Sequence, residues 1–289
     1  MKAIILAAGR GSRLKNVIGE KPKSLIKINR KTLIEYSLDA LSKAGIKEVI
    51  MVIGYKGNMI KKTLGDFYKN LSIRYVENLQ YAKTDTMYSL YKTKDLIDED
   101  VIILEADLLY EEDLIEKIIS SKIPNFLILS DLTNSGDEVF VSSRDRMNID
   151  KIGKKIEKKD IIGEFIGISK LSYNFLIGVF NYFEKDIIHR ARKNWCEDIF
   201  VEFSQKFHKP LAPFLIKYLI WTEIDKPQDL EKARNEIFSK IDLKNKNVKI
   251  EKILDDLKKK ISLLFKCLIV ALGLELALII VIILLLIFS

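Results

Sequence analysis

Short apolar runs alternate with amphipathic stretches along the first half of the chain. The runs at 2–7, 48–53, 73–77, 101–106 and 125–130 have the length and hydrophobicity of buried strands. Between them, apolar positions recur at spacings of three and four, which predicts helices over 32–44, 58–69 and 111–121. This alternation predicts an α/β fold built on a doubly wound, mostly parallel, Rossmann-like sheet.

The pattern changes after residue 138. Shorter strand-like pieces are expected at 139–142, 149–157, 164–169 and 214–218, with helices over 172–192 and 195–207. Lys226-Pro227 then opens a helix to about residue 240, because proline is well tolerated at the start of a helix. We therefore expect one folded domain over 1–240, large enough for an enzyme, then a basic amphipathic linker helix at 241–262 and an apolar segment at 263–289.

That last segment is strongly apolar. Residues 267–288 contain only Gly273 and Glu275 as interruptions and would form a helix about 33 Å long, enough for a bilayer core of about 30 Å. The acid costs about 3 kcal/mol on insertion, whereas the Leu, Ile, Val and Phe residues contribute about −5 to −10 kcal/mol. We expect a single C-terminal transmembrane anchor at 263–289; the alternative is a buried core helix or an oligomerisation helix.

The charges near this segment suggest its orientation. Lys258, Lys259, Lys260 and Lys266 precede it, so the positive-inside rule places the domain 1–240 in the cytoplasm of a membrane-anchored protein. Residues 250–262 are typical of a basic amphipathic helix lying on the membrane surface. A membrane-bound transferase is then a candidate partner.

Composition excludes several other classes. The net charge is +8, but the lysines are scattered beside acids, so we expect no nucleic-acid partner. Cys196 and Cys267 lie in different regions, which makes a disulfide improbable and fits a reducing compartment. With two histidines and no Cys/His cluster, nothing supports a zinc site.

The first apolar run ends in a loop suited to phosphates. Small residues and glycines let the backbone N–H groups approach an anion, and two cations follow at Arg13 and Lys23. The loop lacks the third glycine of a dinucleotide fingerprint and the Gly-Lys-Ser/Thr of a Walker loop. The alternative is a tight strand-to-helix turn with incidental cations. The candidate nucleotide-binding residues here are Leu6, Ala7, Ala8, Gly9, Gly11 and Ser12.

Two acidic motifs follow strands. Asp107 ends Leu104-Glu105-Ala106-Asp107, and Asp225 lies in Glu223-Ile224-Asp225-Lys226-Pro227. Ligands of open parallel sheets gather outside the carboxyl ends of strands, and Mg²⁺ prefers carboxylate oxygens shared with substrate phosphates. We therefore expect Asp107 and Asp225 to converge on Mg²⁺. The alternative for Asp107 alone is a helix cap or a loop acid.

A third segment, 77–90, carries amides and hydroxyls ahead of a predicted helix. Such groups could recognise a base edge and a sugar, or Thr84 or Asp85 could simply cap the helix. The candidate nucleotide-binding residues here are Gln80, Thr84, Asp85, Thr86 and Ser89.

Candidates for a second substrate are less specific. Trp195, Glu197 and Asp198 combine an aromatic face with carboxylates, which suits an amine or a quaternary ammonium group. The alternative is a core tryptophan beside solvated acids. Glu164, in Gly163-Glu164-Phe165, is a further candidate, or a plain strand residue.

Taken in order, these motifs resemble a known family. The strings L-A-A-G-R-G-S-R with K-P-K, K-T-D-T-M-Y-S-L-Y, L-E-A-D-L-L-Y, G-E-F-I-G-I-S-K and W-T-E-I-D-K-P-Q-D-L look like those of nucleotidyltransferases, in particular the cytidylyltransferases that activate phosphocholine or 2-aminoethylphosphonate. The resemblance covers about residues 1–240. Asp85 departs from it, because the similar enzymes usually carry Asn there.

The resemblance implies CTP as donor, Mg²⁺ on Asp107 and Asp225, the loop 8–13 on the nucleotide, and Lys23 as a catalytic residue that contacts phosphate. Arg13 is expected to assist it. The acceptor would be a small phosphorylated amino alcohol or aminophosphonate. Two alternatives stay open: a nucleotidyltransferase for sugar 1-phosphates or inositol phosphate, and an inactive binding subunit tethered to the membrane.

Overall fold

The computed structural model describes residues 1–188 and 195–288. Its contacts divide the chain into two compact units, Met1–Ile241 and Asp242–Ser289. The first unit contains every strand of the described residues and is the unit that carries the candidate site.

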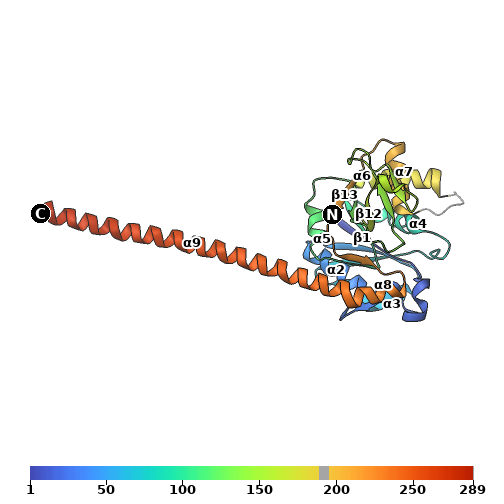
Figure 1. Ribbon diagram of the computed structural model, residues 1–289, viewed down its shortest axis with the longest axis horizontal. Coiled ribbons are helices and arrows are strands. Elements are labelled where there is room, and N and C mark those ends of the chain that lie inside the picture. Colours follow the sequence, from blue (N-terminus) through green and yellow to red (C-terminus); the bar gives the residue numbers. More distant parts are fainter. Residues whose placement is uncertain (189–194, 289) are drawn as a thin grey trace. The chain divides into compact units, whose positions relative to one another are not determined.

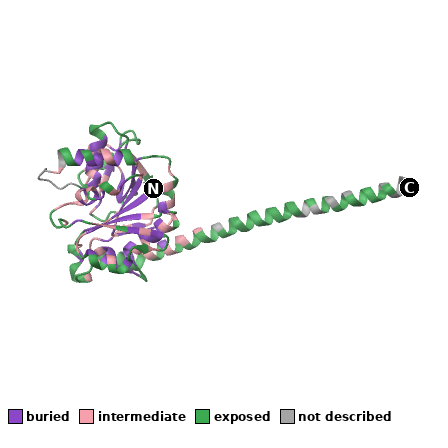
Figure 2. Cartoon of the chain, turned by 180° about the vertical axis from the view of Figure 1, so that it is seen from behind, coloured by how far each residue is buried: buried purple, intermediate pink, exposed green. Residues whose placement is uncertain are grey.

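The centre of the first unit is a parallel array of strands. β1 (Lys2–Ala7) lies between β7 (Val101–Glu105) and β4 (Glu48–Ile53), and β4 pairs in parallel with β6 (Leu71–Glu77). β5 (Phe67–Tyr68) joins the edge in the antiparallel direction. The apolar runs of β1, β4 and β7 form buried strands as predicted (Figure 2). The run at 73–77 does not, because β6 lies near the edge of the sheet and its residues Arg74 and Glu77 are exposed.

The other half of the ten-stranded sheet is mixed. β12 (Ile161–Leu171) runs antiparallel to β7 and also pairs with β9 (Phe126–Ser130) and β10 (Phe140–Ser142). β13 (Ala212–Ile216) lies parallel to β9, and β11 (Lys151–Gly153) pairs with β10. The prediction of a doubly wound α/β fold is confirmed, with a sheet that is mixed and mostly parallel at its centre (Figure 1).

Helices cover both faces of this sheet. One buried cluster joins the sheet to α2 (Leu33–Lys43), α3 (Gly57–Leu64) and α5 (Leu114–Ser120). A second joins the other face to α4 (Thr86–Tyr91), α6 (Tyr173–Tyr182) and α7 (Cys196–Lys206). The shorter elements are α1 (Lys15–Ile18), β2 (Lys27–Ile28), β3 (Lys31–Thr32), 3-10 helices at Ser12–Leu14, Lys23–Leu25, Lys94–Leu96 and Lys158–Asp160, and π-helical turns at Phe183–Ile187 and Ala233–Ile237.

Local chemistry explains where two predicted helices begin and end. Thr32 and Glu35 form a capping box that starts α2, close to the predicted residue 32. α3 stops at Gly65, whose φ of 67° ends the helix before the predicted residue 69. The predicted helix 172–192 is α6 and the π-helical turn that follows; residues 189–192 lie outside the described residues.

A separate two-stranded sheet joins distant parts of the chain. β8 (Leu108–Tyr110) pairs antiparallel with β14 (Trp221–Glu223), placing Glu223 opposite Leu108. α8 (Pro227–Lys232) follows, and Leu230 packs in a third apolar cluster that also contains Leu14 of the first loop. This small sheet brings the second acidic motif beside the first.

The last helix, α9 (Phe238–Phe288), extends through the second unit. In the part of the chain that the structure describes, no helix combines the length and the apolar character needed to cross a bilayer. The lysine-rich residues 244–266 occupy the middle of α9, and Glu275 interrupts the apolar residues that follow. The predicted transmembrane anchor at 263–289 and the membrane localisation inferred from it are therefore wrong, and the membrane-bound partner has no support in this structure.

Candidate active site

A cavity of about 380 Å³ opens at the carboxyl ends of β1 and β7. Most of the predicted nucleotide and metal residues line it: Leu6, Ala7, Ala8, Gly9, Gly11, Ser12, Arg13, Lys23, Thr84, Asp85, Thr86, Ser89, Asp107 and Asp225. The sequence did not single out Ser24, Tyr81, Glu105, Ala106 and Glu223, which also line it. Trp195 also lines it, so the site gathers residues from six separate segments of the chain.

Close packing shapes the loop after β1. Gly11 has a φ of 60°, and a Cβ there would lie 3.0 Å from the Cβ of Lys23. Gly54 supports the loop from behind, since a Cβ on it would lie 2.8 Å from the carbonyl oxygen of Ala8. Tyr55 N–H donates to that same carbonyl at 3.1 Å. Small residues are therefore required on both sides of this loop.

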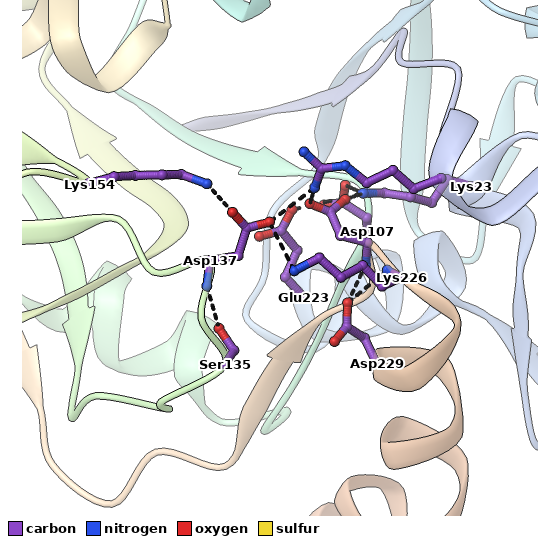
Figure 3. A network of polar contacts seen from close by, with 10 residues as sticks. Lys23, Asp107, Ser135, Asp137, Lys154, Glu223, Lys226 and Asp229 are labelled. Atoms are coloured by element: carbon purple, nitrogen blue, oxygen red, sulfur yellow. Dashed lines mark hydrogen bonds and ion pairs between the residues drawn. The ribbon is translucent and has the colours of Figure 1, made fainter.

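The small sheet explains how the two acidic motifs meet. Asp107 immediately precedes β8, Asp225 follows β14, and Ile224 N–H donates to the Asp107 carbonyl oxygen at 3.1 Å. The carboxylates of both aspartates reach the Lys23 ammonium, Asp107 at 2.5 Å (Figure 3). The backbone N–H of Asp225 donates to Asp229, which fixes the turn into α8. The structure brings the two aspartates together; their role as metal ligands stays a prediction.

Lys23 is enclosed by negative charge. Glu223 lies 3.8 Å from its ammonium, and the Lys23 side chain is only 13% exposed. Burial alone would lower the pKa of Lys23, but Asp107, Asp225 and Glu223 outweigh it and raise that pKa. Burial would likewise raise the pKa of Asp225, yet the Lys23 ammonium lowers it. Lys23 is therefore a permanent cation facing the cavity.

Arg13 supplies the second cation. Its Nη1 donates to Asp225 at 3.2 Å and to Asp137 at 3.0 Å. The side chain is 57% exposed, so the guanidinium lies at the edge of the cavity rather than beneath it. Arg13 and Lys23 thus hold Asp225 from two directions.

Two further carboxylates, Glu105 and Glu223, were missed as site residues. Oxygens of Glu105, Asp107 and Glu223 lie within 4.8 Å of one another. Burial and the charge of Asp107 raise the pKa values of Glu105 and Glu223. A signal was present in the sequence, because each glutamate stands two residues before an aspartate and alternate residues of a strand share a face.

This cluster fits a divalent cation. The Asp107 Oδ1 atom is buried without a hydrogen-bond partner among the described residues, which leaves an acceptor available to a ligand. The donor set consists of carboxylate oxygens alone, the ligands that Mg²⁺ prefers. Asp107, Glu105 and Glu223 could hold such an ion. Asp225 shares the Lys23 ammonium with Asp107 and Glu223.

Asn78 organises the segment predicted to contact the nucleotide. Its buried side-chain amide donates to Thr84 Oγ1 at 3.0 Å and to Ser89 Oγ at 2.9 Å, and its Oδ1 accepts from Gln80 N–H at 2.9 Å. Gln80 is exposed and does not line the cavity. Asp85 is the residue before α4, but its side chain makes no capping hydrogen bond to that helix. Asn78, which was not among the predicted site residues, therefore holds this segment in place.

The candidate acceptor residues do not all lie at the cavity. Trp195 lines the cavity, and the neighbouring Cys196 N–H donates to Thr86 Oγ1 at 3.0 Å. Glu197 is buried in the first turn of α7, and burial raises its pKa to about 7. Asp198 lies in the same turn, and neither Glu197 nor Asp198 is among the residues that line the cavity.

Glu164 lies apart from this group. Its buried carboxylate accepts from Thr133 N–H at 2.8 Å and from Thr133 Oγ1 at 3.1 Å, and it does not line the cavity. The structure therefore places Glu164 as the anchor of the loop after β9 and not with the other candidate acceptor residues.

The fold and this site define a class of enzyme. The family model of nucleotidyl transferases matches residues 2–125. The CTP:phosphoglutamine cytidylyltransferase of Campylobacter jejuni is 30% identical over 254 residues, which cover 80% of this chain and 98% of that protein. The chain therefore belongs to the nucleotidyltransferase family and is an enzyme of that class.

Other similarities agree with this assignment. The choline-phosphate cytidylyltransferase of Streptococcus pneumoniae is 38% identical over 107 residues, 37% of this chain and 44% of that protein. The solved inositol-1-phosphate CTP transferase from T. maritima shares the fold with a TM-score of 0.68 at 22% identity, over 83% of this chain and 95% of that chain. The resemblance to nucleotidyltransferases predicted from the motifs is confirmed.

Proposed function

We propose that this enzyme transfers a cytidylyl group from CTP to a small phosphorylated amino alcohol or aminophosphonate, with Mg²⁺, releasing pyrophosphate. The observation that carries the proposal is the convergence of Lys23, Asp107 and Asp225 beside the glycine-rich loop in one cavity. The names of the two relatives, which act on phosphoglutamine and choline phosphate, support CTP as donor and a small phosphorylated acceptor.

The residues of the chain supply mainly position and charge. The loop at 8–13 offers backbone N–H groups to the triphosphate, and Arg13 and Lys23 neutralise the charge that develops as pyrophosphate leaves. The acceptor phosphate is already anionic near neutral pH, since its second pKa is about 6, so its oxygen attacks the α-phosphorus without a general base. Lys23 keeps its proton throughout because three carboxylates surround it.

Mg²⁺ would be held by Asp107 and Asp225, as the family resemblance implies. Glu105 and Glu223, whose oxygens lie within 4.8 Å of an Asp107 oxygen, would be further donors. When bound, the ion would neutralise phosphate oxygens as a Lewis acid. Without the ion, Lys23 neutralises Asp107, Asp225 and Glu223. With Mg²⁺ bound to these carboxylates, the Lys23 ammonium would be able to contact the substrate phosphates instead.

The acceptor head group would lie near Trp195. An aromatic face binds an ammonium or quaternary ammonium group. Glu197, buried behind the cavity lining in the first turn of α7, adds negative charge when it is ionised. Asp198 is a second acid in that turn. Phosphocholine, 2-aminoethylphosphonate and phosphoglutamine all combine a phosphorus acid with a nitrogen-bearing head group.

A panel of acceptors tests the proposal. Phosphocholine, 2-aminoethylphosphonate, phosphoglutamine, inositol 1-phosphate and glucose 1-phosphate are each incubated with CTP or dTTP and Mg²⁺, and pyrophosphate release is measured. We expect release with CTP and one of the nitrogen-bearing acceptors. Release only with sugar or inositol phosphates would favour the alternative acceptor class, and no release from any pair would favour an inactive binding subunit.

A further inference from the structure

Asp137 connects three cations from three different segments. It lies in the loop 131–139 between β9 and β10, and the sequence gives no sign that it belongs to the site. Its carboxylate accepts from Arg13 Nη1 at 3.0 Å, pairs with Lys154, and lies 3.6 Å from the Lys226 ammonium (Figure 3). Asp137 therefore links the nucleotide loop to the residue that follows Asp225.

The loop that carries Asp137 is itself held in place. Asp131 accepts from Tyr218 N–H at 2.7 Å, and Thr133 is bound by the buried Glu164. Asp137 N–H donates to Ser135 Oγ at 3.3 Å, closing the end of the loop. These contacts give Asp137 a fixed position from which to hold Arg13.

Arg13 needs such support. It is more than half exposed, and one of its two carboxylate partners is Asp225. When Mg²⁺ and a triphosphate occupy the site, Asp225 has a stronger partner than Arg13, so Asp137 becomes the contact that keeps the guanidinium beside the cavity. An exposed arginine without an anchor loses rotamer freedom when it binds phosphate, and that loss weakens binding.

We propose that Asp137 is a positioning residue that holds Arg13 ready for the triphosphate. The proposal rests on the function proposed above. Lys154 and Lys226 stabilise the Asp137 carboxylate, which in turn fixes the direction of the Arg13 guanidinium. Asp137 thereby sets the affinity for the nucleotide rather than the rate of the chemical step.

The test compares Asp137→Asn with the wild type in two assays: calorimetric binding of CTP with Mg²⁺, and steady-state pyrophosphate release. In Asp137→Asn, Arg13 has to lose its rotamer freedom when CTP binds. We therefore expect the dissociation constant and KM for CTP to rise about 3- to 10-fold, with a smaller change in kcat. Asp137→Glu keeps the charge and should recover most of the affinity. Asp160→Asn is the matched control, an exposed acid outside this network that should leave both constants unchanged.

A double-mutant cycle separates positioning from a general structural role. In an Arg13→Ala background, Asp137→Asn should add less than a twofold further loss, because its effect passes through Arg13. Equal losses in both backgrounds, or tighter CTP binding by Asp137→Asn, would overturn the proposal. If the Asn variant does not fold, Lys154→Met, which removes one support of Asp137, provides the same comparison.

The two assays also separate this proposal from the proposed function. A wild type that binds CTP but releases no pyrophosphate with any acceptor refutes the reaction, while the binding constants still decide the role of Asp137. A wild type that binds no nucleoside triphosphate overturns both.

Discussion

Lys23 is the residue whose replacement should reveal most about the site. Its side chain is 13% exposed and balances Asp107, Asp225 and Glu223. Lys23→Met keeps most of the side-chain volume but leaves Asp107 and Glu223 without their cation and Asp225 with Arg13 alone. Removing one partner of a buried ion pair costs about 3–5 kcal/mol, because the remaining charge is uncompensated.

This cost can be measured as a melting temperature. For a unit of this size, 1 kcal/mol corresponds to about 2–4 °C, so we expect Lys23→Met to melt about 6–20 °C below the wild type in EDTA at pH 7.5. Added Mg²⁺ should restore much of the difference, since a bound cation replaces the missing charge. At a concentration 100 times its dissociation constant, an ion stabilises the folded state by about 2.7 kcal/mol.

The assay is thermal unfolding followed by circular dichroism, with and without Mg²⁺. Lys21→Met is the matched control, because Lys21 is exposed and two residues away. A Lys23→Met variant that melts within 1 °C of the wild type in EDTA, or gains no more from Mg²⁺ than the wild type, would refute the charge balance described here. Unchanged turnover in Lys23→Ala would refute the catalytic role proposed for Lys23.

Three further outcomes follow from individual contacts. Burial raises the pKa of Glu197 to about 7, so its protonated form favours folding at low pH and this contribution is lost as pH rises through 7. Glu197→Gln should remove this pH dependence and raise the free energy of unfolding by about 3 kcal/mol above pH 8. Urea unfolding at a series of pH values measures both effects. A wild-type stability that is flat from pH 5 to pH 9 would contradict this. Gly54→Ala should push the Ala8 carbonyl aside, costing about 1–3 kcal/mol and raising KM for CTP; a variant with unchanged KM would show that the loop tolerates the added methyl group. Asn78→Ala leaves buried hydrogen-bond partners unpaired, so we expect the free energy of unfolding to fall by about 1–3 kcal/mol and proteolysis within 78–89 to become faster. Protease resistance equal to that of the wild type would argue that Asn78 does not organise this segment.

The sequence predicts the parts of this enzyme that depend on local pattern. Continuous apolar runs predict the central parallel strands, and a strand followed by small residues predicts the loop that lines the cavity. The segment after β1 and the acidic motif after β7 could be placed together because strand ends of a parallel sheet share an edge. Helix ends were less accurate, since the end of α3 depends on the positive φ of Gly65.

Features that depend on long-range contacts could not be read in the same way. The role of Asp137 depends on its ion pairs with Arg13, Lys154 and Lys226, and no sequence spacing relates these residues to one another. Glu164 was a candidate acceptor residue from its neighbours in sequence, yet its carboxylate accepts from Thr133, in the loop that follows the neighbouring strand β9. Tertiary pairing decides such cases, and only the coordinates supply it.

The pairing of β8 with β14 determines at which stage of folding the active site is complete. Segments so far apart in the chain meet late, because closing the long intervening loop costs entropy. During synthesis the loop that contains Gly9 and Gly11 therefore emerges well before Glu223 and Asp225 exist. A nascent or shortened polypeptide ending before β14 would present Lys23 to Asp107 alone, and it would stay catalytically silent until its final strand docked.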